Sequence, residues 1–525
     1  MAFWHSSGRR YLRTEIVCLL LVLFTCLMLL DGCNVATQKR NVVTPEDTRL
    51  LDRGSRFLKA HMLDGQVYIL SEWNVDSNEK IVSGAGELLS ANRDILAEGI
   101  FSFPLDSVAI FETNRVHTSG AVMAMAVITG ASVALTMYCI ANPKACFGSC
   151  PTFYVEDGEK PILQAEGFSS SVAPSLEASD IDALYRAKPK RKEFDVMMKN
   201  EALETHVVRY ADLLAVRRLE GGRIFASPDG AFWQATQIIQ PARCNGPEGD
   251  CQKELRAFDG LERISQTYST FLGAKETIDL EFDTLPDGNL GLVVASRQSL
   301  LSTYLFYQTL AYMGSSVADW MAQLERDDDL MRKAINRFDE LLGGIEILVQ
   351  DKTGSWISAT QVCENGPLAT DVRVVPLPNL GSGFQKIRLH FTKGDWRLDW
   401  VAMAVLEREV APLMLQPVRV RHNTDLDEIA QKSLLDTSQV LVTLPGDIYT
   451  LTYRLPDDFN KYELFLKSQG YYIEWIRDEW LAEEDPARAA MMFLNPEKAL
   501  HVLAPEFKRI ESVMEESFWR SRYAR

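Results

Sequence analysis

The residue types that most often carry catalysis are scarce in this sequence and widely spaced. It has seven histidines and nine cysteines in 525 residues. Their spacing matches no zinc-protease, nucleophile-elbow, phosphate-loop or dinucleotide-binding motif. Glu204 and His206 would share one face of a strand and could supply half of a metal site, but no second ligand cluster accompanies them. We therefore favour a satisfied, partly exposed strand pair, and we predict no catalytic residue, no metal and no cofactor.

Cys33 stands where a lipid anchor would be attached. Three arginines precede an apolar run from Ile16 to Leu30, which continues into Asp31-Gly32-Cys33. An apolar run of fifteen residues is typical of a signal peptide, whereas a full membrane span needs about 20. The end of the run resembles the bacterial lipoprotein signal, with Asp31 at a position where a small or apolar residue is usual. We predict a signal peptide over 1–32 and acylation of Cys33. The alternative is an uncleaved anchor helix, which also places the N-terminus at a membrane.

Two further pairs of cysteines could form disulfides in an oxidising envelope. Cys244 and Cys251 flank a turn-rich hexapeptide that would bring their Cα atoms within reach of each other. Cys146 and Cys150 are separated by three residues, a spacing that is neither the redox C-x2-C nor half of a paired zinc motif. We interpret both pairs as structural disulfides. A thiol sensor built on Cys146 and Cys150 is the alternative for the second pair.

Residues 119–141 form a second apolar segment, 23 residues long and without a charge. As a helix it would measure about 35 Å, enough to cross a hydrocarbon core of about 30 Å. Ala126, Gly130 and Ala134 have the four-residue spacing that lets helices approach closely in lipid. We favour a membrane-embedded helix. The alternative is a buried core helix, because many of these side chains are small and weakly hydrophobic.

The composition indicates a folded chain of several domains. Apolar residues make up 46% and charged residues 24%, as in ordinary globular proteins. The net charge of −17 opposes binding to nucleic acid, which needs a basic surface, so we predict no nucleic-acid partner. The partner that the sequence does indicate is membrane lipid, through acylated Cys33 and residues 119–141. A protein or glycan partner is not identified by the sequence.

Short strands with turn signals dominate the chain, which predicts an α+β fold that is mostly antiparallel β. In Lys386–Phe391 every second residue is apolar, as in a sandwich with one packed and one wet face. A helical period appears around residues 299–342 and near the C-terminus. The predicted organisation is a signal peptide (1–32), a tether (33–55), a small β meander (56–117), the hydrophobic helix (118–141), a β-rich domain (142–296), a helical segment (297–344), a β-sandwich-like domain (345–460) and a C-terminal helical region (461–525).

A family resemblance is carried by the region that follows the hydrophobic segment. The run Cys150-Pro151-Thr152-Phe153-Tyr154, the Asp157-Gly158 turn and the later Glu204-Thr205-His206 resemble a group of uncharacterised bacterial envelope lipoproteins that have a Cys-Pro-aromatic-Tyr hairpin. Residues 394–400 are similar to the sandwich part of those proteins. The resemblance implies a location and an architecture, and it transfers no catalytic residue.

Together these features predict a membrane-anchored lipoprotein of the bacterial cell envelope, non-enzymatic and with a structural or binding role. We expect the bulk to be periplasmic, where the Cys244–Cys251 loop could oxidise. The alternative is an envelope hydrolase or carbohydrate-active protein on the sandwich. Four tryptophans would suit sugar stacking if exposed, namely Trp396, Trp400, Trp475 and Trp480. That alternative requires two carboxylates about 5–10 Å apart in a cleft beside an exposed tryptophan.

Overall fold

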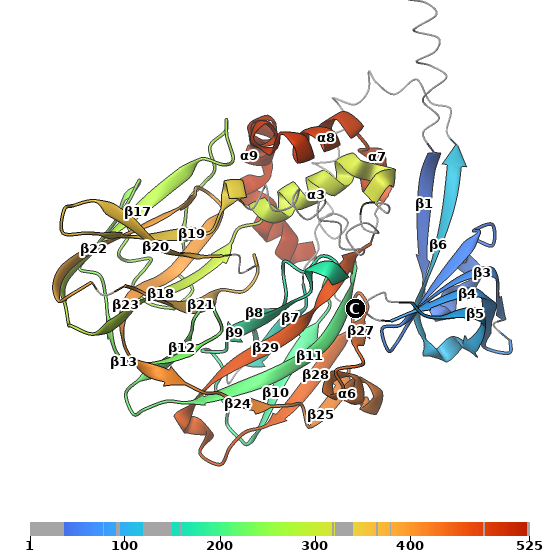
Figure 1. Cartoon of the computed structure of the whole chain (residues 1–525), viewed down its shortest axis with the longest axis horizontal. Helices are drawn as coiled ribbons and strands as arrows, with labels where there is room; N and C mark the ends of the chain where they lie inside the picture. Colours follow the sequence, from blue (N-terminus) through green and yellow to red (C-terminus); the bar gives the residue numbers. More distant parts are fainter. Residues whose placement is uncertain are drawn as a thin grey trace, which may run out of the picture.

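The computed structural model of the chain describes residues 36–76, 78–90, 95–118, 150–157, 160–317, 320, 340–363, 366–378, 380–475 and 478–521. The strands in these ranges form five sheets that are almost entirely antiparallel, and helices gather at one end of the larger body (Figure 1). This confirms the predicted class, a mostly antiparallel β fold with helices. No helix within the described ranges is long and apolar enough to cross a membrane. The hydrophobic segment 119–141 lies outside these ranges.

Sheet A contains the first six strands and stands beside the larger body (Figure 1). The strands are β1 (Ala36–Val43), β2 (Phe57–Met62), β3 (Val67–Asp76), β4 (Ile81–Leu89), β5 (Ile95–Pro104) and β6 (Val108–Thr118). Their order is β1-β6-β2-β3-β4-β5, and Leu58, Leu70, Val82 and Phe111 lie in the core. The segment predicted as a polar tether differs from expectation, since it forms β1 and the 3-10 helix η1 (Pro45–Leu50). The reason is tertiary, because β1 pairs along its whole length with β6.

Sheets B and C each combine strands from residues 152–217 with strands from residues 413–474. Sheet B, in the order β26-β25-β28-β10-β7-β8, consists of β7 (Thr152–Glu156), β8 (Pro161–Glu166), β10 (Glu193–Lys199), β25 (Arg419–His422), β26 (Asp425–Leu426) and β28 (Ile448–Arg454). Sheet C has the order β24-β11-β29-β9, with β27 also on β11, and consists of β9 (Ala178–Ala183), β11 (Glu204–Arg217), β24 (Leu413–Leu415), β27 (Leu441–Thr443) and β29 (Tyr462–Glu474). The predicted hairpin after Cys150 is β7–β8. Pro161 is the first residue of the edge strand β8, where a missing N–H is tolerated.

Sheets D and E form the other half of the larger body. Sheet D, in the order β13-β12-β21-β18-β23-β16 with β13 also paired to β23, consists of β12 (Arg223–Ala226), β13 (Phe232–Ile239), β16 (Arg263–Ile264), β18 (Asn289–Gln298), β21 (Asp371–Pro376) and β23 (Trp396–Val410). Sheet E, in the order β15-β14-β17-β22-β19-β20, consists of β14 (Arg243–Gly246), β15 (Gly249–Asp250), β17 (Lys275–Leu285), β19 (Ile345–Gln350), β20 (Trp356–Val362) and β22 (Gly383–Thr392).

Sheets B, C, D and E stack in that order, so the two middle sheets are buried on both faces. On β11, Leu213 belongs to the core shared with sheet B, and Leu214 belongs to the core shared with sheet D. On β18, Val293 faces sheet C and Leu292 faces sheet E. Strands that are buried on both faces need continuous apolar sequence, whereas outer strands need alternation. This explains the apolar runs at residues 213–216 of β11 and 290–295 of β18, and the clean alternation of β22.

Four helices lie together at one end of the stack (Figure 1). They are α3 (Leu301–Met313), α7 (Asp478–Ala482), α8 (Pro486–Leu494) and α9 (Pro496–Ser521), while α6 (Glu428–Leu435) packs against sheets B and C. The remaining 3-10 helices are η2 (Leu105–Ser107), η4 (Pro174–Leu176), η5 (Gly314–Ser316) and η6 (Phe459–Lys461). Leu301 and Leu305 of α3 share one core with Leu500 and Phe507 of α9. Each such buried side chain contributes roughly 1.5–3 kcal/mol of transfer free energy.

Two predicted boundaries differ from the structure. The C-terminal region predicted as helical from residue 461 begins with the 13-residue strand β29, and the helices follow from Asp478. β29 is a strand because it pairs with β11 from Glu474 to Tyr462, which overrides local preference. The units predicted as 142–296 and 345–460 are interleaved, since sheets D and E each contain strands from both.

Candidate functional site: the terminal ribbon and the buried polar groups

The first candidate site is the place where the sequence predicts attachment to a membrane. β1 and β6 form a two-stranded ribbon in which Ala36 lies opposite Thr118 and Val43 lies opposite Phe111. Figure 1 shows this ribbon projecting from sheet A. Cys33 precedes the ribbon and residues 119–141 follow it, and both lie outside the described residues. Ala36 and Thr118, at the tip of the ribbon, are therefore neighbours. Cys33 lies three residues before Ala36, and the predicted apolar segment begins directly after Thr118.

Sheet A and the larger body contact each other below this ribbon. His61 and Ile110 of sheet A line a small hollow together with Val207 and Tyr471 of sheet C. Ala109 belongs to the same apolar cluster as α3, and β1 contacts η5. Thr118, which precedes the segment 119–149, belongs to sheet A, and Cys150, which follows it, belongs to the larger body. These two bodies are in contact.

Glu204 and His206, the one pair with metal-site potential in the sequence, lie side by side on β11. The Oε1 atom of Glu204 is 3.0 Å from Nε2 of His206, and both side chains are fully buried. On the neighbouring strand β29 they face Glu474 and Tyr472, and the hydroxyl of Tyr307 donates to Glu474. Among the described residues no group of three or more His, Cys, Asp or Glu side chains could hold a metal ion. The arrangement is a hydrogen-bonded pair within a sheet, but the predicted partial exposure is wrong, because β27 and β29 flank this part of β11 and both side chains are fully buried.

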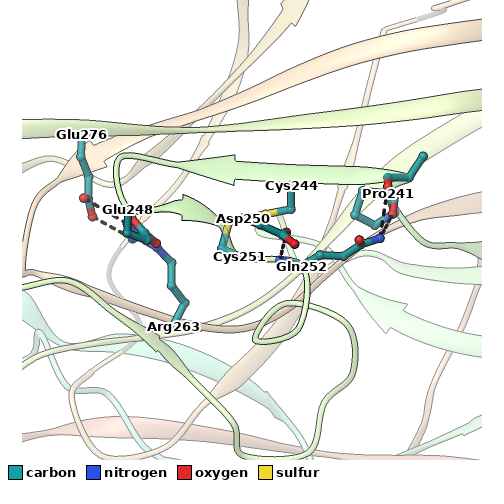
Figure 2. The surroundings of a disulfide bond; sticks show 9 residues. Pro241, Cys244, Glu248, Asp250, Cys251, Gln252, Arg263 and Glu276 are labelled. Atoms are coloured by element: carbon teal, nitrogen blue, oxygen red, sulfur yellow. Dashed lines mark hydrogen bonds and ion pairs between the residues drawn. A yellow bond between two sulfur atoms is a disulfide. The ribbon is translucent and has the colours of Figure 1, made fainter.

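Cys244 and Cys251 are joined by a disulfide that closes the β14–β15 hairpin (Figure 2). Their Cα atoms are 5.4 Å apart, and both residues are buried in the core between sheets D and E. Glu248 at the tip of the hairpin accepts hydrogen bonds of 2.6 and 2.8 Å from Arg263. Arg263 also donates to Glu276, at 2.8 Å. The disulfide closes the base of the hairpin, and the ion pair between Glu248 and Arg263 holds its tip. Both interactions stabilise the local structure.

Cys150 is buried against Val172 and Tyr472, while its predicted partner Cys146 lies outside the described residues. The pairing of these two cysteines thus stays a prediction. The four tryptophans considered for sugar stacking lie in the interior or close to it. Trp396, Trp400 and Trp480 are buried, and half-buried Trp475 donates from Nε1 to the hydroxyl of Thr205.

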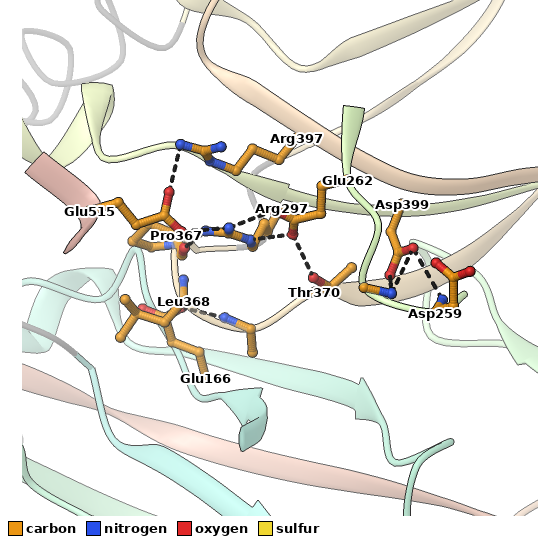
Figure 3. Close-up of polar contacts among 12 residues, drawn as sticks. Glu166, Asp259, Glu262, Arg297, Pro367, Leu368, Thr370, Arg397, Asp399 and Glu515 are labelled. Atoms are coloured by element: carbon orange, nitrogen blue, oxygen red, sulfur yellow. Dashed lines mark hydrogen bonds and ion pairs between the residues drawn. The ribbon is translucent and has the colours of Figure 1, made fainter. Parts of the chain in front are cut away.

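A network of charged residues joins α9 to sheet D (Figure 3). Arg297 on β18 donates two hydrogen bonds of 2.6 Å to Glu262 and one of 2.6 Å to Glu515 on α9. Its third nitrogen donates to the carbonyl of Pro367 at 2.8 Å. Arg397, directly opposite on β23, forms an ion pair of 2.6 Å with the other oxygen of Glu515. One carboxylate therefore connects two arginines of neighbouring strands to the last helix.

Buried carboxyl groups lie next to this network. Glu166 on β8 accepts hydrogen bonds from the backbone N–H groups of Leu368, at 2.7 Å, and Ala369, at 3.4 Å. Burial raises the pKa of Glu166 to about 7, although these N–H groups and Arg297 oppose the rise. Its other oxygen has no hydrogen-bond partner in the described structure.

A second group of buried acids lies between sheets C and D. Asp180 and Asp182 on β9 face Asp371 and Arg373 on β21, and the Asp180 carboxylate is 3.3 Å from the guanidinium of Arg373. Burial, followed by the neighbouring carboxylates, raises the pKa of Asp182 well above its usual value. Asp182 and Asp371 are buried between the packed sheets, and the side chain of Asp180 is 25% exposed. Arg373 pairs with both Asp180 and Asp371, so the group stabilises the contact between the two sheets.

The hydrolase alternative can be compared with one pocket of about 320 Å³, which lies between α9 and sheet D. Glu511 and Glu515 line it, one helical turn apart on α9. No tryptophan lines this pocket. Glu511 accepts hydrogen bonds from Lys508 at 2.7 Å and from the N–H of Thr267 at 2.6 Å, and Glu515 is held by the two arginines. Two carboxylates that are already neutralised do not match the free acid and base of a glycosidase.

No protein-family model and no curated protein matches this chain. Among solved structures, BuGH86 in complex with neoagarooctaose aligns with 44% of this chain and 33% of its own, at 8% identity and a TM-score of 0.16. A beta-porphyranase of glycoside hydrolase family 86 from Bacteroides plebeius aligns with 48% and 42%, at 7% identity and a TM-score of 0.15. An exo-beta-1,3-galactanase from Phanerochaete chrysosporium aligns with 64% and 82%, at 8% identity and a TM-score of 0.15. The chain thus spans about a third of the BuGH86 chain, and similarities this low carry no argument about fold or function.

Sequence reasoning missed the charged network altogether. Arg297 and Glu515 are 218 residues apart in the sequence, so no local spacing connects them. The available signal was weak but physical. Arg297 stands two residues after the apolar run of β18, and Arg397 occupies a polar position in the alternation at the start of β23; a charge beside buried strand residues needs a partner.

Proposed function

We propose that this chain is a non-enzymatic protein of the bacterial cell envelope, held at a membrane by an acylated Cys33 and by residues 119–141, with a structural or binding role. The observation that carries the proposal is the register of the terminal ribbon. Ala36 lies opposite Thr118, so the residues that follow Cys33 and those that precede the apolar segment are neighbours. Two hydrophobic segments that leave a folded body at one point can enter the same membrane surface together.

A single lipid chain gives only marginal membrane binding, and stable attachment takes two signals. Residues 119–141 would supply the second signal beside the acyl group. Because sheet A touches the larger body, we propose that the chain leaves and returns on the same side of the membrane. The hydrophobic segment would then be a helix that is embedded in the membrane and does not cross it.

The rest of the chain would lie in the periplasm. The Cys244–Cys251 disulfide supports this location, since such bonds persist in oxidising compartments. The stack of sheets B to E, with its interior closed by buried charge pairs, suits a scaffold or binding role better than catalysis.

Metabolic labelling with palmitate tests the anchor. We expect label in the wild type and none in Cys33→Ser, whereas Cys363→Ser, which changes an exposed cysteine of the larger body, should be labelled normally. Deleting residues 119–141 in the Cys33→Ser background should release the protein from the membrane fraction, and each change alone should release less. Equal labelling of Cys33→Ser and wild type would refute the lipid anchor.

A further inference from the structure

Strand β5 (Ile95–Pro104) forms one edge of sheet A, where it pairs with β4 and with no other strand of the described ranges. Its first six residues are exposed, and Ile100 is 88% exposed. The sequence from Ile95 to Phe103 contains no lysine and no proline, the residues with which natural edge strands prevent further pairing. A long, exposed and largely apolar edge is a template on which another strand can add.

The backbone groups that β5 can offer to a new strand follow from its pairing with β4. The N–H of Leu105, directly after the strand, donates to the carbonyl of Lys80. Bonded and non-bonded pairs alternate in an antiparallel ladder, so the odd-numbered residues from Gly99 to Phe103 bond to β4. The even-numbered residues, among them Glu98 and Ile100, direct their N–H and C=O groups to the open edge.

We propose that the added strand is β5 of a second copy of this chain, antiparallel to the first about a two-fold axis at Gly99. In this register Glu98 lies opposite Ile100 of the second copy, and the two residues exchange backbone hydrogen bonds. The pairing uses every residue from Ile95 to Phe103 and ends before Pro104, which has no N–H to donate. An axis at Glu98 instead would place two carboxylates opposite each other, which destabilises a sheet.

The same register brings apolar side chains together on one face of the sheet. Phe101 and Phe103 contact the ring of Tyr68, with ring centroids 5.1 and 4.2 Å away, and Phe103 lies in the core of sheet A. Ala97 lies on the same face, because side chains alternate along a strand, but it is exposed. In the pair it lies opposite Phe101 of the second copy. The apolar face of sheet A therefore continues across the two-fold axis.

The twist of sheet A allows both copies to attach to one membrane. In the strand order of the sheet, β5 is five positions from β1. Neighbouring strands are rotated by about 20–25°, so the sheet normal at β5 is turned by about 100–125° and lies roughly along the β1–β6 ribbon. The two-fold axis follows this normal and leaves both ribbons pointing in the same direction. The pairing itself depends on β5 and not on the proposed anchor.

Sedimentation equilibrium of the full-length chain in density-matched detergent tests the pairing. The wild type should have twice the mass of one chain. Ile100→Glu places a carboxylate opposite Glu98 of the second copy and should weaken the dimer at least tenfold, whereas the matched control Ile100→Val should stay dimeric. The double variant Glu98→Lys/Ile100→Glu restores opposite charges across the axis and should recover the dimer. All three variants should fold, because both positions are exposed.

Disulfide cross-linking tests the register. One copy carries Glu98→Cys, and a second, differently tagged copy carries Ile100→Cys, both in a Cys363→Ser background. Oxidation should join them, because opposite residues of a bonded pair have Cα atoms about 5.5 Å apart. Two copies that both carry Glu98→Cys are the control, since their Cα atoms are about 8–9 Å apart, beyond the reach of a disulfide.

Three outcomes would overturn the proposal. The first is a monomeric wild type, which would leave the edge of β5 to a strand of another protein. The second is equal association of Ile100→Glu and Ile100→Val. The third is a mixed pair that cross-links no more than the control pair.

Discussion

Arg297 and Arg397 lie directly opposite each other on β18 and β23, and they share the carboxylate of Glu515 on α9. Like charges in opposite positions of a sheet destabilise it unless a counter-charge is supplied. Here the last helix supplies that counter-charge. The ion pairs therefore couple the docking of α9 to the stability of sheet D, two elements that are far apart in the sequence.

Glu515→Gln should lower the free energy of unfolding by about 2–4 kcal/mol, because it leaves two poorly hydrated arginines with one charged partner fewer. Urea unfolding monitored by circular dichroism measures this loss. Glu497→Gln changes an exposed carboxylate in the first turn of the same helix and should lower the stability by at most about 1 kcal/mol, the contribution of its interaction with the helix dipole. Equal stability of the two variants would show that the shared carboxylate does not hold the helix.

The disulfide should contribute about 2–3 kcal/mol, the loop-closure value for two cysteines seven positions apart. The double variant Cys244→Ser/Cys251→Ser should lose this amount, and the reduced wild type should lose a similar amount. Adding a reductant to the double variant should have no further effect on the unfolding of this part of the chain. A double variant as stable as the oxidised wild type would contradict a structural role.

Contacts between residues that are close in the sequence could be predicted, whereas contacts between distant residues could not. The Cys244–Cys251 pairing and the β7–β8 hairpin were predictable because turn chemistry determines local contacts. The alternation of β22 was readable because one of its faces is solvated. β29 was misassigned because its pairing with β11 lies some 250 residues away and overrides local preference.

The same limit applies to the candidate sites. Glu204 and His206 were noticed because a two-residue spacing on a strand is a local pattern. Arg397 and its pocket depend on α9, β23 and the start of α3 meeting in space, which no spacing in the sequence encodes. The sequence signal for Arg397, a charge at an alternating position between two buried apolar residues, does not identify a partner.

Stability should depend on pH through Glu166. Its carboxyl pKa is about 7 in the folded protein, above the ordinary 4.5, so the folded state holds the proton more tightly. The stabilisation is fully present below pH 4.5 and is lost as the pH rises through about 7. The total change is about 3 kcal/mol for this one group.

Urea unfolding at pH 5 and pH 8 measures this dependence. Glu166→Gln keeps the shape of the side chain and removes its titration, so the loss of stability between the two pH values should be smaller than in the wild type. Glu98→Gln, on the exposed strand β5, should retain the full loss. If Glu166→Gln shows the wild-type loss, another group causes the dependence, with Asp182 as the next to change, through Asp182→Asn.

The contact between sheet A and the larger body makes a definite prediction about membrane topology. An epitope inserted in the exposed β3–β4 turn between Asn78 and Glu79 and a second epitope after Arg525 should lie on the same side of the membrane, because their two bodies touch. With a periplasmic bulk, protease added to spheroplasts should remove both epitopes, while a cytoplasmic marker stays intact. Alkaline phosphatase fused after Arg525 should be active in the same cells. If the protease removes only the first epitope, residues 119–141 cross the membrane once, and sheet A cannot then pack against sheet C as the structure has it.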